Sequence, residues 1–346
     1  MPKWLSAALI IAAAVLLTAG VIFYAVGRHH FGRDVMVADI EVMSTVAEIT
    51  LPAGKNTGED ILAAAEALAS VQSYCNIFDE ESELAELNRT AHEQPFVCSE
   101  ELYAVLSEAR RAYSVSEGRF DISCLPLMRI WGFHAGDDDE ELTRPDSEEL
   151  LSALAMTGLD KVVFDDAARS VYFPVKGMCL DLGGIAKGYA VDRAVDVLSA
   201  RKCRSGVVNL GGNLRVLPDG LRRGGKYGIG IKNPLNPASV CYSINVKGGY
   251  AVATSGSYER FVEIDGIYYS HIIDPSSGEP AVSSVLSATV VAPTAIQADW
   301  LSTAVFIGGE EFARRMVKLY PQLRIILCIA TDNECGFTIV DLPEAG

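Results

Sequence analysis

Asp299 and Thr303 are the pair of side chains with the clearest potential for chemistry. They lie in the segment QADWLSTAVF, which is otherwise mostly small and apolar. Residues four apart share one face of a helix, so a carboxylate and a hydroxyl would lie side by side there. A buried carboxylate is costly unless a positive group meets it. The pattern therefore predicts either a bound cation or a carboxylate on a solvated helix face, and both readings stay open.

His271 is the second candidate for chemistry. It lies in YYSHIIDPSSGEP, in a predicted strand that ends at Asp274-Pro275. Imidazole titrates near neutral pH, so a histidine can accept the proton of an attacking hydroxyl. The other histidines lie beside the N-terminal apolar segment, in a polar loop and at the edge of an acidic loop. A lone strand histidine is often structural, so catalysis and packing are both retained.

Glycines around Lys187 are the third candidate. In CLDLGGIAKGYAVDRAVDVL a predicted strand passes into a predicted helix through Gly183, Gly184 and Gly188. Glycines at a helix start let the backbone approach an anion and direct free amides at it. The spacing is neither a Walker loop nor GxGxxG, because Lys187 precedes Gly188 and Tyr189 follows it. Phosphate binding is therefore a hypothesis and not a motif match.

A helix must position the first pair. Thr294 and Gln297 have the spacing of a capping box, and Gly308-Gly309 is a typical helix stop. These signals predict a helix of about three turns that carries Asp299 and Thr303.

The rest of the chain mixes helices with short strands. Periodicity predicts helices over residues 58–78, 99–118 and 183–200, and residues 37–51 are predicted as a strand. From about residue 160 short strands alternate with turns, and Asp265-Gly266 predicts a hairpin. Because strands and helices do not alternate strictly, the predicted fold class is α+β.

Composition excludes some functional classes. The 346 residues carry a formal net charge of -16 at pH 7, which opposes binding to a phosphate backbone, so no nucleic-acid partner is expected. The eight cysteines include no CxxC pair, and a zinc site is not indicated.

The N-terminal segment differs in kind from the rest. Residues 4–27 carry no charged side chain, and about 20 apolar residues are enough to span a bilayer. This length exceeds the apolar core of a cleavable signal peptide, so we predict one uncleaved transmembrane helix. The chain is therefore divided into a membrane anchor with its linker at residues 1–36 and one domain at residues 37–346.

Eight segments, taken in order, resemble the consecutive motifs of ApbE-type FAD:protein FMN transferases. They are DEESELAELN, EGRFDIS and PLMRIWGF, followed by DLGGIAKGYAVDRAV, VNLGGN, ATSGSYERF, YSHIIDPSSGEP and ADWLSTAVF. The resemblance extends from about residue 38 to residue 340. It implies a single α+β flavin-transferase domain with mixed or antiparallel sheets and flanking helices.

The resemblance also implies roles for individual residues. A divalent metal, normally Mg²⁺, would be bound by the side chains of Asp299 and Thr303, with Ser302 nearby, and by the carbonyl of Gly184. Lys187 would contact phosphate, and His271 is the best-placed base. The residues implied to bind FAD are Met43, Phe78, Arg119, Phe120, Asp121, Asp181, Lys187 and Ile273.

The implied reaction moves the FMN half of FAD onto a Thr or Ser hydroxyl of an acceptor protein, forming a phosphoester and releasing AMP. The expected acceptor is an FMN-binding domain of a sodium-pumping quinone reductase or Rnf-type subunit. Two alternatives stay open, a Mg²⁺-dependent FAD pyrophosphatase that yields FMN and AMP, and a membrane-tethered flavin-binding protein. The apolar N-terminus and the habit of the family together predict a cell-membrane location, with a single N-terminal anchor and the catalytic domain outside.

Overall fold

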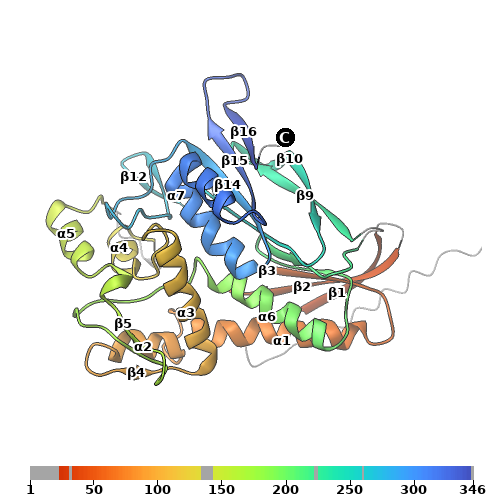
Figure 1. The fold of residues 1–346 in the computed structure, drawn as a ribbon, viewed down its shortest axis with the longest axis horizontal. Coiled ribbons are helices and arrows are strands. Elements are labelled where there is room, and N and C mark those ends of the chain that lie inside the picture. Colours follow the sequence, from red (N-terminus) through yellow and green to blue (C-terminus); the bar gives the residue numbers. More distant parts are fainter. Residues whose placement is uncertain (1–22, 31–32, 134–142, 222–224, 259–260, 344–346) are drawn as a thin grey trace, which may run out of the picture.

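The computed structural model describes residues 23–30, 33–133, 143–221, 225–258 and 261–343 (Figure 1). Its centre is a nine-stranded sheet, in which every described strand pair is antiparallel. In spatial order its strands are β1 (Phe23–His30), β2 (Arg33–Val42), β3 (Thr45–Pro52), β7 (Val207–Leu210), β8 (Asn213–Val216), β11 (Ala251–Gly256), β14 (Val285–Ala292), β15 (Arg324–Ala330) and β16 (Phe337–Leu342).

Three long helices cover one face of this sheet. They are α1 (Thr57–Cys75), α6 (Ala186–Ala200) and α7 (Ala295–Leu319). α1 packs on α6, α6 packs on α7, and α7 also packs on β11 and β14 (Figure 1). A hairpin of β9 (Lys226–Asn233) and β10 (Asn236–Lys247) covers the opposite face. Much of the sheet is therefore buried on both faces, beneath the helices on one side and beneath the hairpin on the other.

The period of two along the strands explains this double covering. In β2, Ala38 and Ile40 pack into the core beneath the helices, whereas Val35 and Val37 pack into the core beneath the β9–β10 hairpin. Successive side chains of a strand point to opposite faces, so a strand that is apolar at both kinds of position can bury both faces.

A smaller region adjoins the helical side of the sheet. Its hairpin of β12 (Phe261–Ile264) and β13 (Ile267–Ser270) packs against α4 (Leu125–Ile130) and α5 (Ser147–Ala155) through a cluster that includes Trp131, Ile264 and Ile273. The other elements of this region are α2 (Glu83–Thr90), α3 (Glu100–Val115), the 3-10 helix η1 (Leu159–Lys161), and the strands β4 (Phe96–Val97), β5 (Val163–Asp165) and β6 (Ser170–Tyr172).

The α+β class and most predicted elements are confirmed. The helices predicted over residues 58–78, 99–118 and 183–200 correspond to α1, α3 and α6. Asp265 and Gly266 form the predicted turn between β12 and β13, and both have positive φ, 53° and 75°.

The single strand predicted over residues 37–51 is wrong. The segment is a hairpin of β2 and β3, in which Val42 pairs with Thr45 and only Met43 and Ser44 form the turn. Both turn residues have positive φ, 53° and 57°, although neither is glycine. Two-residue hairpin turns usually carry Asn-Gly or Asp-Gly, so the sequence held no ordinary signal for this turn.

The helix that carries Asp299 begins where predicted but extends further. The Thr294 side chain accepts a hydrogen bond from the backbone N–H of Gln297 at 3.3 Å. Gly309 has a non-helical φ of 69°, and α7 then resumes to Leu319. The predicted end is therefore only a kink, because the residues beyond it, including Phe312 and Met316, are buried in the core.

The start of the sheet also differs from the prediction. Phe23–His30 forms β1, which pairs with β2, so the end of the predicted apolar span and much of the predicted linker belong to the sheet. β1 occupies an edge of β2 that would otherwise expose unpaired backbone groups. Residues 1–22, which hold most of the predicted transmembrane helix, lie outside the described residues. Among the residues described, no helix is long and apolar enough to cross a membrane.

Candidate active site

A cavity of about 670 Å³ lies where the start of α6, the first half of α7 and several loops meet. Its walls come from segments far apart in the chain, from the β2–β3 turn to α7. Every site residue predicted from the sequence lines this cavity except Ser302. These residues are Met43, Phe78, Arg119, Phe120, Asp121, Asp181, Gly184, Lys187, His271, Ile273, Asp299 and Thr303.

Asp299 is buried, with 5% of its surface exposed. Its Oδ2 accepts a hydrogen bond from the backbone N–H of Gly188 at 2.8 Å, and its Oδ1 accepts one from Nδ2 of Asn213 at 3.0 Å. Burial raises the pKa of the Asp299 carboxyl group above its ordinary value, and the nearby charge of Lys187 opposes the rise. The alternative reading, a carboxylate on a solvated helix face, is therefore wrong.

At Gly188, α6 lies very close to the start of α7. A Cβ atom at this position would lie 2.4 Å from the carbonyl oxygen of Ala295 and 2.7 Å from Cβ of Asp299. Only a residue without a side chain allows this contact, which brings the Gly188 N–H to Asp299. This glycine of the GGIAKG segment therefore has a packing role that the sequence did not reveal.

Asp192 caps the start of α7 from the neighbouring helix α6. Its Oδ1 and Oδ2 accept hydrogen bonds from the backbone N–H groups of Ala295 and Ile296, both at 2.9 Å. Nη1 of Arg215 on β8 pairs with Oδ1 at 2.7 Å. Burial raises the pKa of Asp192, and the charge of Arg215 opposes the rise. The first N–H groups of a helix have no partner within it, so this cap ties α6 and α7 together near Asp299.

Thr303 and Gly184 lie on adjacent parts of the cavity wall. A Cβ at Gly184 would lie 4.0 Å from Oγ1 of Thr303, and this Oγ1 lies 3.2 Å from Oγ of Ser255. Ser302 behaves differently, since it is fully buried and does not line the cavity. Its Oγ donates to the carbonyl oxygen of Asp299 at 2.8 Å and lies 2.7 Å from Oγ of Ser255. The prediction of Ser302 as part of a metal site is corrected, because packing commits its hydroxyl to the protein.

The remaining donors suit a hard divalent cation. They are a carboxylate on Asp299, a hydroxyl on Thr303 and a carbonyl on Gly184, and oxygen ligands of this kind are typical of Mg²⁺ and Ca²⁺ sites. Nζ of Lys187 donates to the carbonyl of Gly183 at 2.8 Å, and its positive charge also acts on the buried carboxyl group of Asp299. In the part of the chain that the structure describes, no cluster of three His, Cys, Asp or Glu side chains could hold a metal. The donor set therefore fits a hard cation better than zinc.

The loop before α6 places a positive charge at the cavity. Oδ1 of Asp181 accepts a hydrogen bond from the N–H of Gly183 at 2.7 Å, which closes a tight turn. Lys187 is half-buried one helical turn beyond that glycine, and its Nζ rests on the same turn. An ammonium group held beside a helix start is suited to an anionic ligand.

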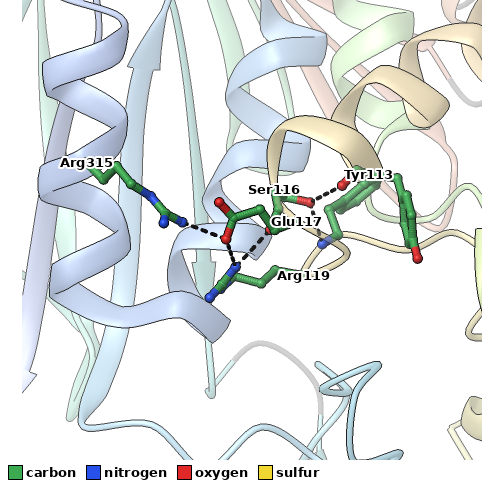
Figure 2. A network of polar contacts seen from close by, with 6 residues as sticks. Tyr113, Ser116, Glu117, Arg119 and Arg315 are labelled. Atoms are coloured by element: carbon green, nitrogen blue, oxygen red, sulfur yellow. Dashed lines mark hydrogen bonds and ion pairs between the residues drawn. The ribbon is translucent and has the colours of Figure 1, made fainter.

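Figure 2 shows the network that holds the turn after α3. Oε2 of Glu117 accepts hydrogen bonds from Arg119 and from Arg315 of α7, both at 2.9 Å. Oγ of Ser116 accepts one from the N–H of Phe120 at 2.9 Å. Arg119 and Phe120 enter the cavity from this turn. The turn is thus fixed to the same helix that carries Asp299.

Asp121 lies at the end of this turn, and its carboxylate is used within the protein. Oδ1 accepts from the N–H and the hydroxyl of Ser123 at 2.7 and 2.6 Å, and Oδ2 accepts from the N–H of Leu159 at 3.2 Å. Burial raises the pKa of Asp121, and these hydrogen bonds oppose the rise. Asp121 therefore shapes the cavity wall as well as lining it.

His271 does not lie within a strand as predicted. β13 ends at Ser270, which pairs with Phe261, and the chain then continues as a loop into the turn that begins at Asp274. His271 is half-buried and borders the cavity beside Ile273. The loop carries the imidazole to the site, so its position depends on the β12–β13 hairpin.

Several cavity residues escaped the sequence analysis. Asn213 follows Gly211 and Gly212 of the VNLGGN segment, and the turn between β7 and β8 places both glycines at positive φ, 58° and 99°. Ser255 belongs to the ATSG segment, where its hydroxyl gave no specific signal. Gln72 lies on α1 and had no signal beyond helical periodicity.

Several known proteins are similar to this chain in sequence. The family model described as the ApbE family matches residues 43–327. The FAD:protein FMN transferase of Vibrio cholerae is 33% identical over 267 residues, which cover 77% of this chain and 78% of the relative. That of Treponema pallidum is 35% identical over 260 residues, which cover 70% and 69%.

Solved structures of ApbE proteins are also similar to this chain. The crystal structure of the ApbE protein from Thermotoga maritima superposes with a TM-score of 0.78 at 30% identity, covering 92% of this chain and 96% of that one. The flavin transferase ApbE from Vibrio cholerae superposes with a TM-score of 0.75 at 27% identity, with the same coverage of 92% and 96%.

Proposed function

This chain belongs to the ApbE family, and from that membership we propose that it is an FAD:protein FMN transferase. One observation carries the proposal: the oxygen donors of Asp299 and Thr303 meet Lys187 and His271 around a single cavity. We propose further that the FMN half of FAD is moved onto a Thr or Ser hydroxyl of an acceptor protein, with release of AMP.

The negative charge of the FAD pyrophosphate is the main obstacle to this reaction. A divalent cation such as Mg²⁺, bound by Asp299, Thr303 and the carbonyl of Gly184, would neutralise that charge. Asp299 is already oriented for this role by Gly188 and Asn213, so little reorganisation is needed. Lys187 provides a second positive charge for the phosphate oxygens.

In this proposal His271 acts on the hydroxyl group of the acceptor protein, which attacks the phosphate. The acceptor hydroxyl oxygen forms a bond to the phosphorus of the FMN phosphate, and the bond from that phosphorus to the bridging oxygen breaks, so AMP leaves. The imidazole of His271 accepts the hydroxyl proton, which is the role of a general base. Storage of a flavin would need no such group, so a base in the cavity supports catalysis over binding alone.

The apolar residues of the cavity suit the flat rings of FAD. Met43, Phe120 and Ile273 line it, and Phe78 lies at the same cavity with 67% of its surface exposed. An aromatic side chain exposed at a cavity can stack on a ring that enters from solvent. These residues would bind the rings while the polar residues align the phosphates.

The location and the acceptor are proposals from the sequence. The uncharged segment at residues 4–27 supports a single-pass N-terminal anchor, with the catalytic domain on the outer side of the cell membrane. The acceptor would then be an FMN-binding domain of an Rnf or sodium-pumping quinone reductase type subunit.

The test is an intact-mass measurement. The full-length protein in detergent is incubated with FAD, Mg²⁺ and an acceptor domain, beside an acceptor whose target Thr or Ser is replaced by Ala. Addition of one FMN to the first acceptor and none to the second is the expected result. Free FMN and AMP with unmodified acceptor would instead indicate a pyrophosphatase, and intact FAD retained by the protein would indicate a flavin-binding role.

A further inference from the structure

The β2–β3 turn is strained where it borders the cavity. Met43 and Ser44 both have left-handed backbone, with φ of 53° and 57°. Such a conformation costs a residue with a side chain on the order of 1 kcal/mol or more. Glycine or asparagine would reduce that cost, yet neither is present. A strained turn persists only where its surroundings hold it.

Gln72 on α1 holds this turn from outside the hairpin. Its side-chain Oε1 accepts a hydrogen bond from the backbone N–H of Met43 at 2.5 Å. The two residues are far apart in the chain, so the bond fastens the tip of the hairpin to a long helix. That helix packs on α6 and provides a firm support.

The other side of the turn is also confined. The N–H of Gly211, in the β7–β8 turn, donates to the carbonyl of Val46 at 3.1 Å. A Cβ at Gly211 would lie 2.7 Å from Oγ1 of Thr45. The β2–β3 turn is therefore seated between α1 and the β7–β8 turn, and Met43, Ser44, Thr45 and Gln72 all line the cavity.

We propose that Gln72 is a positioning residue that keeps the β2–β3 turn in its strained form, so that Met43 packs against a ring of FAD. The proposal rests on the proposed function, because it takes FAD as the ligand of the cavity. Met43 needs a fixed position because a flexible thioether side chain on an untethered turn would lose much of its contact with the ring.

Two substitutions at Gln72 test this role in the full-length protein. Gln72→Leu keeps the size of the side chain and removes the acceptor, whereas Gln72→Glu keeps an oxygen at the same place. We expect the dissociation constant for FAD, measured by flavin fluorescence, to rise about tenfold in Gln72→Leu, which corresponds to about 1.4 kcal/mol. It should stay near the wild-type value in Gln72→Glu. The KM for FAD should follow the same pattern with little change in kcat.

A second change tests the strain directly. Ser44→Gly removes the steric cost of the left-handed backbone, so in the Gln72→Leu background it should recover part of the lost affinity. A merely structural role for Gln72 would not produce this rescue. Gln322→Leu, at an exposed position beyond α7, is the matched control and should bind FAD as the wild type does.

The outcomes separate this inference from the proposed function. Gln72→Leu binding FAD as tightly as the wild type, or Gln72→Glu failing as badly as Gln72→Leu, would overturn the inference even if transfer activity is intact. If the wild type binds FAD but modifies no acceptor, the proposed function is wrong. The dissociation constants of the Gln72 variants for FAD still test the role of Gln72 in that case. A wild type that does not bind FAD would remove both.

Discussion

The backbone N–H of Gly188, in the first turn of α6, donates a 2.8 Å hydrogen bond to Oδ2 of Asp299 in the second turn of α7. The bond exists because two helix backbones approach more closely than any side chain at position 188 would allow. The orientation of the proposed metal-binding carboxylate is therefore built into the α6–α7 contact.

Gly188→Ala should destabilise the protein and impair the site together. The added Cβ would overlap the carbonyl of Ala295, so α6 and α7 must move apart. We expect the free energy of unfolding to fall by about 1–3 kcal/mol, as for other overpacked cores, and the activity of the folded fraction to fall as well. Gly58→Ala is the control, because this position of α1 is exposed and a Cβ added there meets no neighbouring group within 4 Å. Equal effects of the two changes in urea unfolding would refute the packing role of Gly188.

Asp299→Asn should abolish the response to metal. The change keeps the shape of the side chain but removes the charge that a cation requires. We expect activity to fall by at least about 100-fold, as when other electrostatic groups of active sites are removed. Mg²⁺ should raise the unfolding temperature of the wild type and leave that of the variant unchanged. Asp332→Asn, on an exposed loop, controls for the loss of a negative charge. If Mg²⁺ still raises the unfolding temperature of the Asp299→Asn variant, the metal assignment is wrong.

His271→Ala should separate binding from catalysis. Loss of a general base typically lowers a rate by about 10²–10⁴-fold, so transfer to the acceptor should fall in this range. The dissociation constant for FAD should change little, because the proposed role of the imidazole concerns the acceptor proton. Quenched time courses of acceptor modification measure the transfer rate, and flavin fluorescence measures the dissociation constant for FAD. A variant that no longer binds FAD would make His271 a binding or structural residue.

Asp341→Asn should reduce the dependence of stability on acid pH. Arg324 donates to both carboxylate oxygens of Asp341, at 2.8 and 2.6 Å, and this pairing lowers the pKa of Asp341. A carboxyl group with a lowered folded-state pKa stabilises the protein above its unfolded pKa of about 3.9, and loses that contribution as pH falls through the folded value.

Because this ion pair is partly exposed, the free energy of unfolding of the wild type should exceed that of the Asp341→Asn variant by only about 0.5–1 kcal/mol near pH 6. The difference should shrink as pH falls below about 4, because the carboxyl group of the unfolded chain takes up a proton before that of the folded protein, and it should vanish below the folded-state pKa. Urea unfolding of both proteins between about pH 6 and about pH 3 measures this difference in free energy of unfolding. A difference that stays constant from about pH 6 to about pH 3 would show that the ion pair is not its source.

Local signals in the sequence were sufficient for several elements. Thr294 with Gln297 marked the start of α7, and Asp265-Gly266 marked the β12–β13 turn, because caps and tight turns depend on only a few neighbouring residues. The turn at Met43-Ser44 had no such signal, since a contact with Gln72 on another element supports it. The kink at Gly309 was mistaken for an end, since the core retains the residues that follow.

The sequence by itself determined which side chains could take part, because the types and order of Asp299, Thr303, Lys187 and His271 already carried the chemistry of a cation, a phosphate and a base. Only the tertiary structure decided that Asp299 is buried and that Ser302 turns away from the cavity. Burial and orientation at these positions depend on Gly188, Asn213 and Ser255, which approach α7 from distant parts of the chain. A local pattern cannot encode such contacts, because they arise only when α6, β8 and β11 pack around the same helix.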